Sequence, residues 1–220
     1  MASYFNLTLD TTAPSGLKVS INDDALYTTS TSVTVKITLS DEQTSGYQMK
    51  IWGIAGVANE EAASWETFAA EKSVTLESGD GLKTVHVKVR DDVGNESAEA
   101  SDDITLNTAV PAVTVTGPDK SKISKVSGFD KSKISFTVDV EFAEYKVCVV
   151  PETSSTQDAG TQIPTDGGSV NTSGTGGSYP ASTPIEVTIS GADLQTASSG
   201  DGVKVVKVFV KTAAGIWSVA

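Results

Sequence analysis

The chain has 220 residues, with 28 acidic against 16 basic side chains, and its formal net charge is −12 at pH 7. This charge speaks against a nucleic-acid-binding protein, which presents a basic stripe, and against docking on an anionic membrane surface. The single cysteine, Cys148, rules out an intrachain disulfide.

The N-terminal stretch MASYFNLTLDTTAP has no basic region followed by an apolar one, so we expect no signal peptide. No window approaches the roughly 20 apolar residues that a membrane-spanning helix needs. We therefore expect a protein that is made in the cytoplasm and does not enter a membrane.

Apolar and polar residues alternate between Gly- and Pro-containing turns, which predicts an all-β chain. Residues 59–70, NEEAASWETFAA, are the one place for a short helix or a structured crossover, where Trp65 and Phe68 are expected to cap the core. The strands predicted in the first half lie near Phe5–Leu9, Leu17–Ile21, Ser32–Leu39, Tyr47–Trp52, Ser73–Leu76, Leu82–Arg90 and Ala98–Leu106.

One stretch of the sequence is repeated. Gly79–Ser97 (GDGLKTVHVKVRDDVGNES) returns as Gly200–Ser218 (GDGVKVVKVFVKTAAGIWS), with nine identical residues at a constant offset of 121. Its central valines alternate with polar residues, which predicts a strand with one buried face, and Gly94 supplies the positive φ of a turn. The chain is therefore predicted to form two domains, residues 1–108 and 109–220.

The second half repeats the strand pattern of the first at offsets between 97 and 121, and the changes in offset locate insertions. The largest insertion is residues 151–183, a Gly-, Ser- and Thr-rich segment with few apolar residues, which cannot bury a core of its own. We predict a long surface loop there, with a short extra strand near Thr161–Ile163. A loop of this length is either functional or mobile, and the sequence favours neither.

About seven short strands in each ~100 residues, with frequent turn signals, are typical of an immunoglobulin-like sandwich. Two motifs add detail, namely LDTTAP at Leu9–Pro14 and the hairpin VKVRDDVGNES at Val87–Ser97. With them the chain resembles the immunoglobulin-like repeats of bacterial and bacteriophage proteins, which open with a D-T-T-A-P joint and close with a D-x-x-G-N-x-S hairpin. The resemblance implies an all-β fold of two tandem immunoglobulin-like β-sandwich domains. The second unit keeps this plan but replaces most of the hairpin's polar residues.

The resemblance also implies a function. Similar bacteriophage domains decorate heads, tail tubes, baseplates and fibres, whereas bacterial ones usually belong to long exported adhesins. A two-unit chain without an export signal fits the phage case better, so we expect a non-enzymatic structural or accessory protein of a bacteriophage virion. Its expected partners are other virion proteins and further copies of itself. The alternative is a cell-surface adhesin or a module that binds a host glycan.

The repeat is out of phase with the chain ends. Ile104–Leu106 closes the first domain, and its counterpart Leu7–Leu9 lies at the N-terminus, where no domain precedes it. Two residues follow Ser218, whereas the first domain continues for nine residues after Ser97, so the second domain is predicted to lack most of its last strand. An unpaired sandwich edge invites strand addition. Two interpretations stay open: residues 3–9 complete this edge in another copy, or they pair within their own domain as an ordinary first strand.

Catalytic chemistry finds little support. The one histidine, His86, is expected on the water-facing side of its strand, and one His with one Cys cannot form a zinc site. Acidic pairs such as Asp91-Asp92 are interpreted as solvated turns rather than as Ca²⁺ ligands. Cys148 is interpreted as inert, partly exposed packing. We therefore expect no enzyme, no cofactor and no metal.

Candidate partner-binding residues come from strand edges and from exposed aromatic rings. A sugar-binding surface would need exposed aromatics, for which Trp52, Trp217 and Tyr179 are the candidates, and Trp217 would serve equally as an interface anchor. The full set of predicted partner-binding residues is Tyr4, Phe5, Leu7, Leu9, Val203, Val205, Trp217 and Tyr179.

Overall fold

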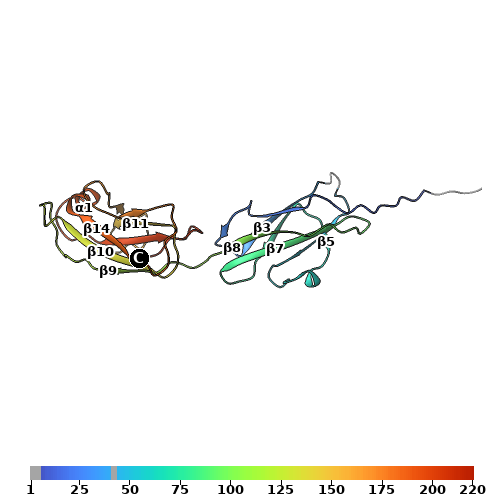
Figure 1. The fold of residues 1–220 in the computed structure, drawn as a ribbon, viewed down its shortest axis with the longest axis horizontal. Coiled ribbons are helices and arrows are strands. Elements are labelled where there is room, and N and C mark those ends of the chain that lie inside the picture. Colours follow the sequence, from blue (N-terminus) through green and yellow to red (C-terminus); the bar gives the residue numbers. More distant parts are fainter. Residues whose placement is uncertain (1–5, 41–43) are drawn as a thin grey trace, which may run out of the picture. The chain divides into compact units, whose positions relative to one another are not determined.

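The computed structural model describes residues 6–40 and 44–220. The chain divides into two compact units, Met1–Thr108 and Ala109–Ala220, and Figure 1 shows that each is built mainly of strands joined by loops.

The first unit is a sandwich of two sheets. One sheet has the order β1-β3-β6 and the other β2-β8-β7-β4-β5, and β8 runs parallel to β2 and antiparallel to β7. A short 3₁₀ helix, η1 (Glu60–Ala62), lies within the segment predicted to be a helix or crossover. The strands of this unit are β1 (Lys18–Ile21), β2 (Tyr27–Thr28), β3 (Ser32–Thr38), β4 (Gln48–Trp52), β5 (Glu66–Thr67), β6 (Glu71–Thr75), β7 (Gly81–Arg90) and β8 (Ala100–Leu106).

The core of the first unit follows from two-residue alternation. The valines at positions 85, 87 and 89 of β7 are fully buried, whereas the residues between them are half-buried on the other face of the strand. Apolar side chains of β3 and β4 fill the same core from the two sheets. Alternation of this kind places one strand face against the opposite sheet, which confirms the period-two prediction for these strands.

The second unit repeats this arrangement with one strand fewer at its edge. One sheet has the order β14-β10-β9, and in the other β11 pairs with β12, β13 and β15. By position in the repeat, β9, β10, β14, β11 and β15 correspond to β1, β3, β6, β4 and β7. The strands are β9 (Val113–Thr116), β10 (Lys131–Val138), β11 (Glu144–Val149), β12 (Thr161–Gln162), β13 (Ser173–Gly174), β14 (Ile185–Ser190) and β15 (Val206–Lys211).

The insertion at residues 151–183 is more structured than the predicted surface loop. It contributes β12, close to the predicted extra strand, and also β13, and both pair with β11. Ile163 and Thr172 are fully buried; the Ile163 N–H donates to the Val147 carbonyl at 2.9 Å, and the Thr172 carbonyl accepts from the Val147 N–H at 2.8 Å. The insertion therefore covers the outer edge of β11, where the few apolar residues that it holds complete the existing core.

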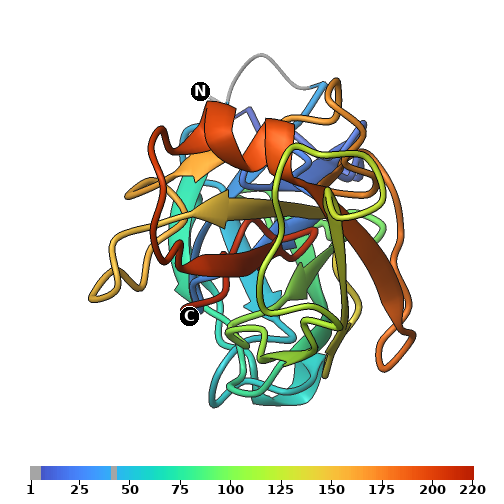
Figure 2. The same cartoon turned by 90° about the vertical axis from the view of Figure 1, so that its left-hand side faces the viewer.

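The helix α1 (Gly191–Ala197) follows β14 directly and was not predicted. Figure 2 shows α1 at one end of the second unit. Ser190 caps it: the Ser190 hydroxyl accepts a hydrogen bond from the Asp193 backbone N–H and donates one to the Asp193 carboxylate. The S-x-x-D sequence with Ser190 as the N-cap is the signal from which the helix could have been found.

The repeated hairpin has the same backbone geometry in both units. Ser97 Oγ accepts a hydrogen bond from the Val89 N–H, and Ser218 Oγ accepts one from the Val210 N–H. Gly94 and Gly215 have φ values of 92° and 91° at the turn, as predicted for Gly94. In both hairpins the side chain that opens the turn also accepts a backbone N–H four residues later: Asp91 accepts from Asn95 and Thr212 from Ile216.

Asp193 fastens the insertion to the second core. Its buried carboxylate accepts hydrogen bonds from the backbone N–H groups of Gly167 and Ser169, both at 2.7 Å, and from the Ser190 hydroxyl. Burial by itself raises the pKa of Asp193, but these hydrogen bonds outweigh it and lower the pKa from 3.8 to about 2.

We expect this network to make the second unit sensitive to acid. Because the pKa of folded Asp193 lies below its unfolded value, its contribution of about 2 kcal/mol is present above pH 4 and is lost as the pH falls through 2. Asp193→Asn should remove that part of the pH dependence, measured by urea denaturation between pH 6 and pH 2. Asp158→Asn, at an exposed carboxylate, is the matched control. Equal pH dependence in both variants would contradict the assignment.

Candidate functional site

The strand β8 closes one side of the first sandwich. Residues 81–85 of β7 pair only with β8, because β4 pairs with residues 86–90. Ile104 and Leu106 of β8 are buried in the core. The backbone N–H of Ile21 in β1 donates a hydrogen bond to the Asp102 carboxylate at 2.7 Å. One strand thus pairs with β7 and also covers the end of β1.

The counterpart of β7 in the second unit, β15, pairs with β11 alone among the described strands. Figure 2 shows β15 in dark red beside the ochre strand β11. The carbonyls of Val205 and Lys211 accept hydrogen bonds from Val150 and Ala143, so odd-numbered residues of β15 face β11. In an antiparallel ladder the intervening residues face the other way, so Val206 and Val208 direct their backbone N–H and C=O groups away from β11.

The missing partner also shortens the strand. β7 has ten residues and β15 has six, and the residues of the second unit that correspond to 81–84 of β7 are 202–205, which are not in a strand. We call residues 202–208, together with Val115 of the neighbouring β9, the open edge.

Val115 shows what a closing strand would cover. Val115 pairs with Phe136 as Ile21 pairs with Val35, so the two residues occupy the same place in their units. Ile21 is 0% exposed, whereas Val115 is 46% exposed. A position that belongs to the core in the first unit therefore faces solvent in the second.

The N-terminal segment carries the leucines of the predicted edge strand. Leu7 and Leu9 are 88% and 87% exposed and lie in no strand, so neither pairs within its own domain. The predicted strand Phe5–Leu9 is wrong for residues 6–9, and Tyr4 and Phe5 lie outside the described residues. The apolar alternation suits a strand, but a strand forms only where a partner supplies the backbone hydrogen bonds.

Of the candidates in the second unit, Val203 and Val205 belong to the open edge. Val203 is 96% exposed, whereas Val205 is half-buried against a cluster of Cys148, Val150 and Phe209. Cys148 is fully buried there, which corrects its predicted partial exposure and confirms its packing role. Burial raises the pKa of the Cys148 thiol.

Trp217 covers the same cluster from the hairpin after β15. It is half-buried, and the ammonium groups of Lys146 and Lys211 lie 4.9 and 5.5 Å from the centre of its ring. Trp65 is placed similarly in the first unit, with Lys50 and Arg90 over its ring. Phe68 packs on the core as predicted, whereas Trp65 is held by cations rather than by the core cluster.

The other two aromatic candidates do not form an exposed platform. Tyr179 stacks on Phe142 with ring centres 4.9 Å apart and meets Tyr145 edge-on, as part of the packing around the second core. Trp52 is buried beneath the His86 ring, which is stacked on it at 5.4 Å. The expectation of exposure fails for both, because Tyr179 packs against the second core and the His86 ring covers Trp52.

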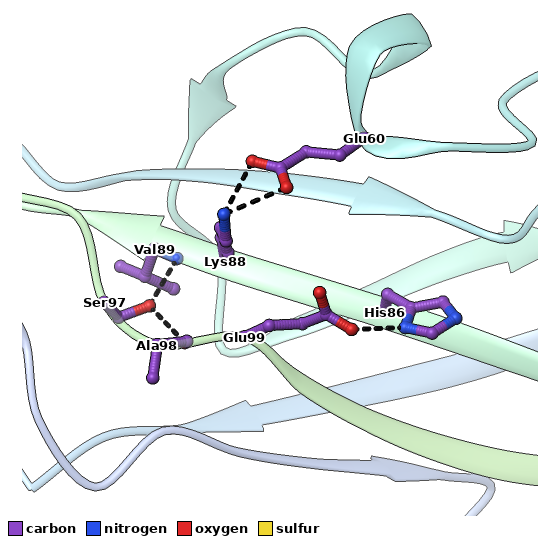
Figure 3. Close-up of polar contacts among 7 residues, drawn as sticks. All are labelled: Glu60, His86, Lys88, Val89, Ser97, Ala98 and Glu99. Atoms are coloured by element: carbon purple, nitrogen blue, oxygen red, sulfur yellow. Dashed lines mark hydrogen bonds and ion pairs between the residues drawn. The ribbon is translucent and has the colours of Figure 1, made fainter.

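Figure 3 shows the polar contacts around His86 on the first unit. His86 Nδ1 lies 2.7 Å from Glu99 Oε1, and Lys88 donates to both carboxylate oxygens of Glu60. His86 is half-buried, not fully exposed as expected, and its neighbours are a carboxylate and an indole rather than a nucleophile. These pairs hold the strand surface together and give the geometry of neither a triad nor a metal site.

Sequence reasoning missed two residues of the site, Asp201 and Thr11, whose counterparts in the first unit are Asp80 and Thr108. Asp80, in the GDG turn before β7, accepts hydrogen bonds from the N–H and hydroxyl of Thr108 at 2.9 and 2.7 Å. The corresponding aspartate of the second unit, Asp201, has no such partner among residues 6–40 and 44–220. The residue that corresponds to Thr108 is Thr11, which is exposed. The signal was present, because the GDG turn and the joint are both repeated.

A cavity of about 650 Å³ lies beside the open edge, between the start of the 151–183 insertion and residues 203–205. Glu152, Asp158 and Lys204 are among its lining residues. Within the described parts of the chain, no cluster of three or more His, Cys, Asp or Glu side chains is placed to hold a metal ion, and no helix is long and apolar enough to cross a membrane.

Comparison with known proteins adds solved structures of low similarity. They include the fibronectin(III)-like modules of CbhA from Clostridium thermocellum, at 15% identity over 91% of this chain and 88% of that chain, with a TM-score of 0.45. The D00-D0 domain of intimin matches at 16% identity over 92% and 96%, with a TM-score of 0.34. The FN1–FN3 domains of chicken CNTN1 match at 14% identity over 94% and 62%, with a TM-score of 0.38.

No family model and no curated protein matches the chain. The paired sheets of both units confirm the prediction of an all-β chain with immunoglobulin-like sandwiches.

We expect equivalent truncations to cost very different amounts in the two units. Ile21→Ala should lower the free energy of unfolding of the first unit by about 3 kcal/mol, because it leaves a cavity under β8. Val115→Ala should lower that of the second unit by about 0.5 kcal/mol, as for a surface residue. Hydrogen exchange measured by mass spectrometry in dilute solution resolves the two units. A loss at Val115 as large as that at Ile21 would mean that the edge is already covered.

Proposed function

We propose that the chain is a non-enzymatic structural protein of a bacteriophage particle, attached to its neighbours through the open edge of the second unit. The observation that carries this proposal is the contrast between the two units: β8 completes the first sandwich, whereas β15 leaves Val206 and Val208 without a described strand partner. A strand edge of this kind is a template for main-chain pairing with another protein.

The two edges of this sheet are treated differently, which supports a role for the open one. The insertion covers β11 with β12 and β13. Proteins usually protect such edges against unwanted pairing. A sandwich that protects one edge and leaves the other free is suited to a defined attachment in one direction.

The phage context rests on the repeated joint and hairpin. The structure brings these two motifs together, because the Asn95 side chain donates long hydrogen bonds of 3.4 and 3.5 Å to the carbonyls of Asp10 and Thr12. A joint and a hairpin that contact each other form a coherent module boundary, as expected for a chain assembled from stackable units. The glycan-binding alternative is weakened, because two of its three aromatic rings are packed into the units.

The test is whether the protein is a component of particles and whether the open edge places it there. Particles purified from cultures that carry the gene should contain the chain at a fixed copy number, measured by quantitative mass spectrometry. Val206→Pro removes an N–H that faces away from β11, and proline is tolerated at such edge positions. This variant should keep its thermal transition yet be depleted from particles at least tenfold.

Thr175→Pro, at an exposed loop residue whose N–H has no hydrogen-bond partner among the described residues, is a control for the effect of proline in the same unit. Absence of the wild-type chain from particles would refute the virion role. Binding of the purified chain to a glycan array in that case would support the adhesin alternative.

A further inference from the structure

The open edge matches a segment of the chain's own N-terminus. We propose that residues 6–11 of one copy pair with residues 200–205 of a second copy, at the start of its open edge, in the place that the end of β8 occupies in the first unit. This inference rests on the proposed function, because it names the occupant of the first part of the same edge. It predicts head-to-tail assembly in which the second unit of each copy is completed by the next.

The side chains of the segment are those that the edge lacks. Leu7 and Leu9 correspond in the repeat to Ile104 and Leu106, which are each 1% exposed in the first core. While Leu7 and Leu9 stay in solvent, the chain does not gain the free energy of burying them. The second unit presents an exposed apolar residue, Val115, beside the open edge. The N-terminal segment thus lacks a strand partner and a core, and the open edge lacks a closing strand.

The register follows from the first unit. There Lys83 pairs with Ile104, Leu82 with Thr105 and Gly81 with Leu106. The offsets of 121 and 97 translate these pairs into Lys204 with Leu7, Val203 with Thr8 and Gly202 with Leu9. Residues 202–205, which lie in no strand in the isolated chain, would then extend β15 toward the length of β7.

A polar contact of the first unit has its counterparts at the same two offsets. In the first unit, Asp80 holds the joint by accepting two hydrogen bonds from Thr108. In the proposed pairing, Asp201 meets Thr11 of the incoming copy. Because Thr11 is exposed and lies next to residues bound by Asn95, the segment is anchored to its own unit while its free side remains available.

The contact joins different surfaces of the two partners, so it is heterologous. Contacts of this kind form a ring if the rotation closes and a filament if it does not. The assembled state should therefore consist of multiples of the 22.8 kDa chain rather than of a closed two-fold dimer alone.

Cysteine trapping tests the register directly. Val203 and Thr8 would form a pair whose backbone groups face away from each other, in which Cα atoms lie about 4.5 Å apart, a spacing compatible with a disulfide. The double variant Thr8→Cys/Val203→Cys, oxidised under mild conditions, should give a ladder of disulfide-linked multimers on a non-reducing gel.

The matched control, Thr8→Cys/Val126→Cys, places the second thiol on another exposed valine of the same unit and should give none. Equal ladders from both pairs, or a disulfide formed within a monomer, would overturn the proposed exchange between copies.

Light scattering at micromolar to millimolar concentration tests the energetics. Leu7→Asp/Leu9→Asp should weaken self-association about 100-fold or more, because two burial terms are lost and two charges are added. Leu26→Asp, at an exposed leucine of the first unit, should leave it unchanged. Asp201→Ala should weaken it by a smaller factor. All three variants should keep the wild-type thermal transition, because these side chains are exposed.

The two proposals fail in different ways. A wild-type chain that stays monomeric throughout this range overturns strand exchange, and its presence in particles would then leave the virion role intact with another protein at the edge. A chain that assembles through Leu7 and Leu9 but is absent from particles supports strand exchange and refutes the virion role.

Discussion

Backbone hydrogen bonding at the edge of a sheet is the constraint on which both units depend. Each N–H and C=O of an edge strand needs a partner, from protein or from water. In the first unit β8 provides these partners for β7, and its own Ile104 and Leu106 are buried in the core. The carboxylate of Asp102 then takes the N–H of Ile21 across the sandwich. One strand thus closes the sheet, the core and the end of the neighbouring strand together.

In the second unit a different part of the chain provides hydrogen bonds for an edge strand. Its 151–183 insertion wraps the outer edge of β11, and Asp193 fastens the insertion to the start of α1. A polar segment can cover the edge of β11, because pairing through backbone hydrogen bonds needs few apolar side chains. The opposite edge, along β15, receives no such cover from the described residues, and a core position, Val115, is exposed beside it.

Charge plays a supporting part in this architecture. Strand surfaces carry cation–carboxylate pairs such as Lys88 with Glu60, and cations over the rings of Trp65 and Trp217. Exposed pairs of this type add little to stability individually, and the long side chains also shield the apolar rings. The buried carboxylate of Asp193 is different, because it is held by a set of directed hydrogen bonds and its pKa falls to about 2.

The sequence by itself determined the fold class, six of the seven strands predicted in the first half and the hairpin geometry. Alternation and turn residues are local properties, so the valines of β7 and the glycine at position 94 could be interpreted directly. The repeat also identified the incomplete edge and the segment that resembles its closing strand. Local signals for α1, from Ser190 to Asp193, were present but were overlooked.

Only the tertiary structure decided which side chains are accessible. Trp52, Tyr179 and Cys148 have the same local pattern as exposed residues, and their burial depends on His86, Phe142 and Phe209, which lie far away in the sequence. The same holds for the insertion, whose composition indicates a free loop until β11 supplies a partner. Strand pairing and burial each depend on two segments of the chain, so the sequence pattern of one segment does not determine them.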